Sequence, residues 1–93
     1  MSVSGSYLTR EEKEKIIKDV VGEYNPGMPE AQIALWTYRI RHLTEHLRQH
    51  PKDYRTLRAL KMLVGKRRRM LNYLKRKDFN RYRNIVHKLG LRG

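Results

Sequence analysis

The sequence contains no cysteine, so disulfide bonds, thiolate metal sites and a cysteine nucleophile are all excluded. It also lacks any apolar run near the roughly 18 residues that a membrane-spanning helix requires. Residues 1–9 carry no Lys or Arg and no long apolar stretch, so they resemble neither a signal peptide nor a transit peptide. These absences predict a soluble protein that works where it is made.

Acidic residues are scarce relative to basic ones. The 93-residue chain has 22 Lys and Arg against 9 Asp and Glu, which gives a formal net charge of +13. Its length allows one small domain, and an apolar content of 39% allows only a thin core. So large an excess of positive charge indicates a polyanionic partner, either a nucleic acid or an anionic membrane surface.

The positive charge is concentrated toward the C-terminus. Residues 1–24 have a net charge of −1, residues 25–64 of +4 and residues 65–93 of +10. A disordered basic tail would lack large apolar side chains, whereas the last segment has ten of them between Met70 and Leu91. We therefore predict that this segment is folded, and a membrane-active basic peptide is disfavoured because its apolar residues are needed for a core.

Local signals predict two helices in the first half of the chain. The first helix runs from about residue 10 to residue 21, with Thr9 and Glu12 at the spacing of a capping box. The second begins at Pro29, where the missing N–H costs nothing, and ends near residue 49. One apolar stripe follows this second helix at spacings of three and four, formed by Ile33, Trp36, Ile40, Leu43 and Leu47.

Two further helices are predicted in the second half, the third between caps at Asp53 and Asp78 and the fourth between Asp78 and Gly90. The third carries an apolar stripe in which Arg67 takes one position, formed otherwise by Leu57, Leu60, Val64, Leu71 and Leu74. Short connections favour antiparallel neighbours. The predicted fold class is therefore all-α, with four helices in a bundle, and the stripes can pair within one chain, so a free monomer is expected.

Histidines and acidic residues are the side chains that could carry catalytic or metal chemistry here. His42, His46 and His50 recur four residues apart on one helical face, which could hold zinc or simply form a polar face that contacts RNA. No thiolate or carboxylate is spaced to complete a metal site, although Glu45 is nearby. The acids are scattered, with no catalytic triad order, P-loop or paired carboxylates. We expect no enzyme activity, no metal and no cofactor.

A cluster on the third helix is the stronger candidate for binding. Lys66, Arg69, Tyr73 and Arg76 lie at spacings of three and four, so they share one face. A tyrosine beside arginines suits a ribose or base edge next to phosphates. The alternative is that Tyr73 is a half-buried bundle residue whose flank the arginines merely solvate.

Several segments in one order resemble the bacterial form of the small-subunit ribosomal protein 15 family. They include GxPEAQI at 27–33, RIxxLTEHL at 39–47, LVGKRR at 63–68, LNYLKRKD at 71–78 and LGLR at 89–92, where x marks a position outside the resemblance. The resemblance covers the chain from about Leu8 to Arg92 and is far more specific than any single motif.

The resemblance implies a three-helix bundle over 29–89, a more mobile N-terminal helix over 9–22 and a flexible segment over 1–8, in a single domain over 1–93. It further implies a structural component of the small ribosomal subunit in the cytoplasm. Such proteins bind a three-way junction in the central domain of small-subunit rRNA and support early assembly. The implied partners are this rRNA, neighbouring small-subunit proteins and large-subunit rRNA through an inter-subunit bridge.

Two sets of contact residues follow from the resemblance. Junction contacts are implied for Gly27, Gln32, Arg39, Arg69, Tyr73 and Arg76. A second contact, to the minor groove of a neighbouring RNA helix, is implied for His46, Asp53 and Thr56. The residue pattern alone assigns Asp53 as a helix cap. The resemblance adds a second role, in which Asp53 accepts hydrogen bonds from an RNA group and orients His46.

The chain departs from the family pattern at two places. Residues 25–28 read Asn-Pro-Gly-Met where Asp-Thr-Gly-Ser is usual, so a threonine hydroxyl is missing and Met28 is a poor helix cap. Residues 54–56 read Tyr-Arg-Thr where His-His-Ser is usual, which keeps a hydroxyl.

A DNA-binding module remains the alternative function, since a basic helix can enter the major groove of DNA. No helix-turn-helix spacing stands out in the sequence, however.

Overall fold

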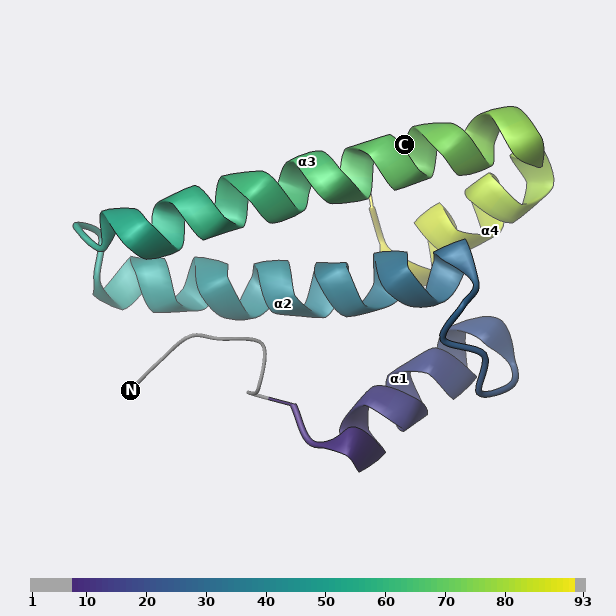
Figure 1. Ribbon diagram of the computed structural model, residues 1–93, viewed down its shortest axis with the longest axis horizontal. Coiled ribbons are helices and arrows are strands. Elements are labelled where there is room, and N and C mark those ends of the chain that lie inside the picture. Colours follow the sequence, from purple (N-terminus) through teal and green to yellow (C-terminus); the bar gives the residue numbers. More distant parts are fainter. Residues whose placement is uncertain (1–7, 92–93) are drawn as a thin grey trace.

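A computed structural model of the chain describes residues 8–91 and places them in four helices (Figure 1). These are α1 (Arg10–Val21), α2 (Pro29–Gln49), α3 (Tyr54–Lys77) and α4 (Phe79–Leu89). The described residues contain no strand, so the predicted all-α class is confirmed. The flexible segment expected over 1–8 lies, except for Leu8, outside the described residues, and the single domain over 1–93 stays a prediction.

The helices begin and end at the predicted signals. Thr9 and Glu12 form the capping box of α1, and Gly22 ends this helix at a φ of 95°, which a side chain would oppose. The carboxylate of Asp78 accepts a hydrogen bond from the Arg81 N–H and caps α4. Met28 makes no side-chain cap to α2, as its apolar side chain predicts.

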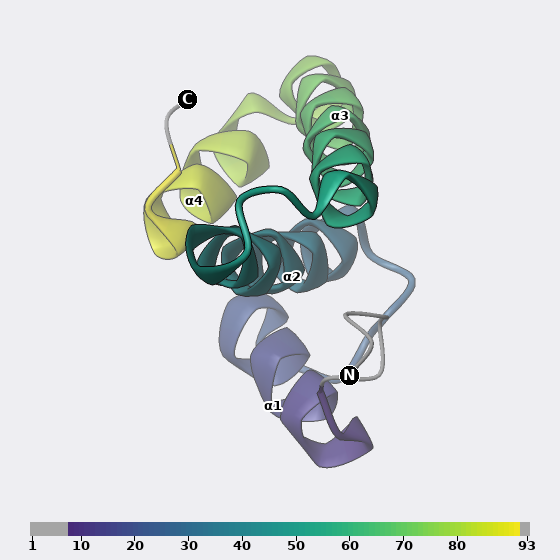
Figure 2. The same cartoon turned by 90° about the vertical axis from the view of Figure 1, so that its left-hand side faces the viewer.

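Helix α2 is the central element of the fold. It runs antiparallel to α3 along most of their lengths (Figure 1), and end-on it lies between α1 on one side and α3 and α4 on the other (Figure 2). The main core forms at the end of the molecule where all four helices meet. Six buried residues make it up: Ile33, Ala34, Leu74, Tyr82, Ile85 and Leu89.

The predicted apolar stripes are buried unevenly. On α2, Ile33, Ile40 and Leu43 are buried, and Ala31 and Ala34 are buried in addition because this helix packs on more than one side. On α3, Leu74 is the only buried member of the predicted stripe, and the others are half-buried. The reason is that the first half of α3 packs against α2 alone, so two helices cannot enclose its leucines (Figure 1).

A part-buried ion pair joins the start of α2 to α4. The Arg81 guanidinium donates from Nε and Nη2 to the two carboxylate oxygens of Glu30, at 2.7 and 2.6 Å. Glu30 is 9% exposed, and these hydrogen bonds hold the pKa of its carboxyl below the ordinary value. This bidentate pair, the Glu30–Arg81 clamp, therefore holds α4 against the N-terminal turn of α2.

Helix α1 packs against α2, with Ile17 buried and Ile16 and Val20 packed against the main core, and it also makes a polar contact to α4. Ile17 is 2% exposed, and the Lys88 ammonium donates to the carbonyl of Val20 at 2.9 Å. A cation at this place satisfies a carbonyl that the end of a helix leaves open. The greater mobility expected of this helix stays a prediction.

We predict that Glu30→Gln lowers the free energy of unfolding by about 1–3 kcal/mol, because it leaves the Arg81 guanidinium without its counter-charge in a part-buried place. Urea unfolding followed by circular dichroism measures this. Glu14→Gln is the matched control, since Glu14 pairs with Arg10 across one helical turn where the Arg10 side chain is 85% exposed. This control is expected to change the stability by less than about 0.5 kcal/mol.

The same clamp predicts a pH dependence with a definite sign. Because folding lowers the pKa of Glu30, its contribution is complete above the ordinary value of 4.5 and is lost as the pH falls through the folded value. Wild type is expected to lose its advantage over Glu30→Gln in acid. An equal difference between the two proteins at neutral and at acidic pH would contradict this assignment.

Candidate functional site

Helix α3 presents an acid-free basic surface. Its 24 residues include ten Lys or Arg and no Asp or Glu. Lys66, Arg69 and Arg76 are all exposed on the face predicted from their spacing. Tyr73 on the same face is 42% exposed, with the Lys77 ammonium 5.9 Å from its ring centre. This exposure favours a surface role for Tyr73 over a place in the core.

A groove between α2 and α3 opens on this face. It has a volume of about 380 Å³ and is lined by Trp36, Lys66, Arg69, Met70 and Tyr73. The structure thus brings three predicted binding residues together around one hollow. Trp36 and Met70 were not among them, since Trp36 was assigned to the core stripe of α2. The sequence gives no signal for this, because Trp36 lies within the apolar stripe and its exposure depends on how α3 packs against α2.

The predicted residues of α2 follow one line along the helix. Gln32, Arg39 and His46 are each seven residues apart, which is two helical turns. The Gln32 side-chain amide donates to the carbonyl of Pro26 at 3.1 Å, so Gln32 lies against the loop that contains Gly27. The Nε of Arg39 is buried and is the only such side-chain atom of the described residues without a partner. An unpaired buried N–H is unfavourable, and a bound acceptor could relieve it.

His46, Asp53 and Thr56 meet where α2 ends and α3 begins. The His46 Nε2 lies 2.8 Å from one carboxylate oxygen of Asp53, and the Thr56 hydroxyl donates to that same oxygen at 2.7 Å. The other oxygen accepts from the Thr56 backbone N–H at 3.1 Å and so caps α3. These hydrogen bonds, those from Thr56 first, lower the pKa of Asp53 from 3.8 to about 2. Asp53 therefore both caps α3 and orients His46.

Thr56 itself faces inward. Thr56 is only 2% exposed, and its hydroxyl donates a hydrogen bond to the Asp53 carboxylate. In this structure the Thr56 hydroxyl positions the Asp53 carboxylate, and the RNA contact expected of Thr56 stays a prediction. His50 lies on the open side of this cluster, with its ring centre 4.9 Å from that of His46.

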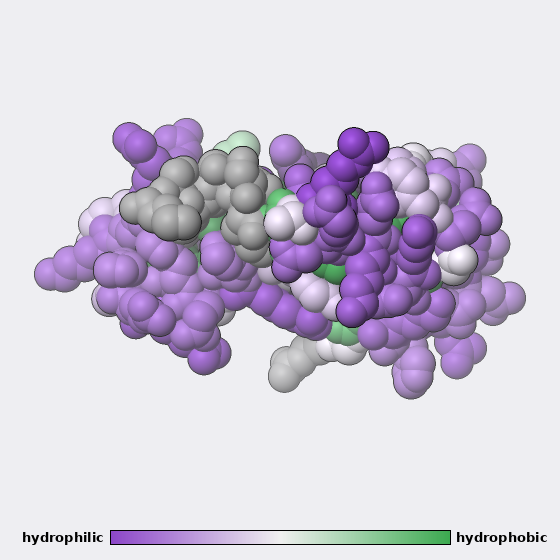
Figure 3. Space-filling view, turned by 90° about the horizontal axis from the view of Figure 1, so that it is seen from below, coloured by the Kyte–Doolittle hydropathy of each residue, from purple (hydrophilic) through white to green (hydrophobic). Residues whose placement is uncertain are grey.

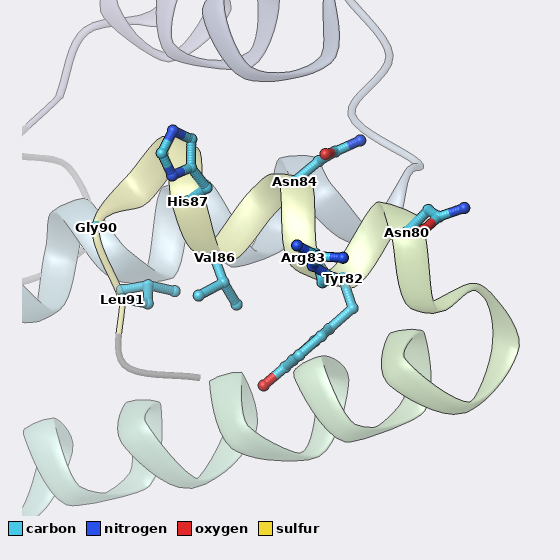
Figure 4. Close-up of a pocket in the computed structure, with 8 residues that line it drawn as sticks. All are labelled: Asn80, Tyr82, Arg83, Asn84, Val86, His87, Gly90 and Leu91. Atoms are coloured by element: carbon cyan, nitrogen blue, oxygen red, sulfur yellow. The ribbon is translucent and has the colours of Figure 1, made fainter.

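Other surfaces offer less. A hollow of about 990 Å³ runs along α4, but Figure 4 shows Tyr82 and Val86 pointing toward α3 while His87 and Asn84 point away, so its lining does not converge. The face on the α1 side is hydrophilic with only small apolar spots (Figure 3). Five of the nine acids lie between residues 11 and 23, so this part of the chain attracts polyanions less than α3 does.

Residues 8–91 contain no group of side chains suited to a metal ion and no helix suited to span a membrane. No three His, Asp or Glu side chains converge there to hold an ion, and His46 bonds to Asp53 instead. None of the four helices is long and apolar enough to cross a membrane.

Comparison with known proteins gives one consistent result. The family model described as "Ribosomal protein S15" matches residues 12–92. A protein of Flavobacterium psychrophilum named "Small ribosomal subunit protein uS15" is 56% identical over 86 residues, covering 92% of this chain and 98% of that protein. Proteins of the same name from Desulfosudis oleivorans and Porphyromonas gingivalis are 54% and 67% identical, over 94% and 71% of this chain and 98% and 74% of their own lengths.

We predict that Thr56→Val raises the pKa of Asp53 from about 2 toward 3.8, because the strongest hydrogen bond to the carboxylate is lost. A pH titration of the Asp53 side-chain carboxyl carbon by NMR measures this. Thr44→Val serves as the control, since the Thr44 hydroxyl bonds to the carbonyl of Ile40 on α2. An unchanged Asp53 pKa in Thr56→Val would show that the hydroxyl does not hold the carboxylate.

Proposed function

The chain belongs to the ribosomal protein S15 family, whose members are structural components of the small ribosomal subunit, and we propose that it binds a three-way junction of small-subunit rRNA there. Binding of this kind would hold the arms of the junction in one arrangement and prepare the central domain for later proteins. The protein would act in the cytoplasm within the ribosome, as a structural protein and not as an enzyme.

The composition and exposure of α3 carry this proposal. Ten cations without an acid on one helix would be a self-repelling arrangement in a free protein, and a polyanion neutralises it. The cations alone would bind any nucleic acid. Tyr73 adds a flat, exposed ring among them, which suits a ribose or a base at a place where the RNA is not a regular duplex.

The residues of α2 extend the surface into two contact regions. Gln32 and Arg39, with Gly27 in the preceding loop, lie at the end where α3 presents Arg69, Tyr73 and Arg76. His46 is fourteen residues beyond Gln32, or about 21 Å along the helix. A junction contact at one end and a contact with an adjoining RNA helix at the other fit this separation.

The second region would read a minor groove through His46 and Asp53. A carboxylate facing RNA is repelled by phosphates, so its presence is useful only if it or its partner makes hydrogen bonds to base edges or 2′-hydroxyls. The hydrogen bonds from Thr56 keep Asp53 ionised and fixed, and Asp53 in turn fixes the His46 ring. Both groups are thus pre-arranged for a specific contact.

Further partners belong to the same proposal. Within the subunit the chain would contact neighbouring small-subunit proteins, and it would contribute to a bridge with large-subunit rRNA. Before assembly it would be a monomer, since the apolar stripes of its helices pair within one chain.

A DNA-binding helical module is the alternative function, because α3 could also enter a major groove. We predict that a junction fragment of small-subunit rRNA competes far better than duplex DNA at about 0.2 M salt, where binding through phosphates alone is weak. Filter binding with competitor measures this. Log affinity for the junction is expected to fall linearly with log salt, and equal competition by duplex DNA would contradict the proposal.

For the minor-groove contact, the change in net charge and the loss of a specific contact are expected to change the affinity for RNA in opposite directions. Asp53→Ala is expected to weaken binding to the junction RNA, although it makes the protein more positive. Against a random RNA duplex the same change is expected to tighten binding or leave it unchanged, since only the electrostatic contribution remains. Asp53→Asn keeps an oxygen that can cap α3, so it separates loss of the contact from loss of the helix start.

Glu45→Ala is the matched control for this comparison. Glu45 also lies near the end of α2, but its side chain is 60% exposed and pairs with Arg48 at 3.5 Å. Its removal is expected to tighten binding to both RNAs by similar factors. If Asp53→Ala behaved in the same way, Asp53 would be only a helix cap.

A further inference from the structure

Trp36 is the only tryptophan in the chain, and the fold does not bury it. Its neighbours on the α2 stripe, Ile33 and Ile40, are 0% and 9% exposed, whereas Trp36 is half-buried at the groove between α2 and α3. Tryptophan is rarely enclosed fully even in a core, so the place of this ring beside exposed cations is the more informative observation. A large flat ring left at the edge of a groove indicates a contact outside the bundle.

The groove around this ring has an apolar floor and a positively charged rim. Met70 packs against the main core and forms the floor with Trp36, while Tyr73 stands beside them and is 42% exposed. Lys66 and Arg69, both exposed, complete the lining. No acid lies on α3, so nothing on that side of the groove opposes a negatively charged ligand.

We propose that this groove holds one unstacked nucleobase of the RNA junction against the indole ring of Trp36, with Lys66 and Arg69 on the flanking phosphates. This inference rests on the proposed function and adds Trp36, Met70 and a ligand to it. The groove has a volume of about 380 Å³ and is open to solvent, which suits a base that is stacked on one face.

The charge around the groove favours a base over an apolar protein side chain. An apolar protein segment would bring no compensation for the two cations at the rim, whereas each nucleotide brings a phosphate next to its base. Stacking on an aromatic ring is the usual way in which proteins hold unpaired bases, and every base has a face that can stack. Bases inside a duplex are already stacked, so the groove would select unpaired nucleotides at the junction.

The single tryptophan allows the contact to be observed directly in the wild-type protein. Trp36 emission is expected to be quenched, and shielded from acrylamide, when the junction fragment of small-subunit rRNA binds. A random RNA duplex at saturating concentration is expected to leave the emission nearly unchanged. Junction fragments made abasic at one unpaired position each are then tested, and one of them is expected to restore the emission while it still binds.

Substitutions measure how much the contact contributes to affinity. Trp36→Leu is expected to weaken junction binding by about 5- to 150-fold, the range of one stacked base, while Trp36→Phe keeps part of it. Tyr38→Leu is the matched control, because Tyr38 is an aromatic residue of α2 that is 39% exposed, two positions along and so on another side of the helix. It is expected to bind like wild type, and thermal unfolding followed by circular dichroism verifies that each variant is folded.

The outcomes separate this inference from the function on which it rests. If wild type prefers the junction RNA but Trp36 emission is unchanged on binding, the groove does not hold a base and the inference is wrong while the function stands. Emission that changes equally with every abasic fragment would likewise overturn it, in favour of general coverage by RNA or a groove kept for a neighbouring protein. If wild type shows no preference for the junction, the proposed function itself fails.

Discussion

The antiparallel contact between α2 and α3 places the residues that we propose to face RNA, apart from Gly27 in the loop before α2. Neither helix alone would form the groove, since Trp36 comes from one and Tyr73 from the other. The contact is held at one end by the four-helix core around Leu74 and at the other by the bonds of Asp53 to His46 and Thr56. A long two-helix arm of this kind can present two contact regions that a rounder domain of 93 residues would bring too close together.

In the middle of this contact, the basic composition of the chain places an arginine at an interior position. Arg67 takes an interior position of α3, where its guanidinium donates to the Thr37 hydroxyl at 3.2 Å. Burial lowers the pKa of Arg67, and the charge of nearby Arg41 lowers it further. Arg41 in turn donates to the carbonyl of Leu89 and closes the end of α4. Neutral acceptors, and not acids, thus satisfy these cations, which leaves the positive field of the bundle intact for a polyanion.

Local signals in the sequence were sufficient for the helix ends, whereas long-range contacts were not. Thr9, Pro29, Asp53 and Gly90 act on residues within a few positions of themselves, so their effect can be predicted without a fold. The clamp between Glu30 and Arg81 joins residues 51 positions apart, and the sequence gives no pattern for it. The inward position of Thr56 and the half-burial of the α3 leucines likewise depend on how many helices cover each place. The position of Trp36 was predicted correctly as part of a stripe, but its exposure at the groove follows only from how α3 crosses α2.

The central claim is that the two ends of the α2–α3 arm contact two separate parts of one folded rRNA. Hydroxyl-radical footprinting of the protein on small-subunit rRNA tests it most directly. We predict protection at the unpaired nucleotides of one three-way junction and across the minor groove of one adjoining helix, with unprotected riboses between the two. Uniform weak protection along many helices, or protection confined to a single continuous duplex, would contradict the claim.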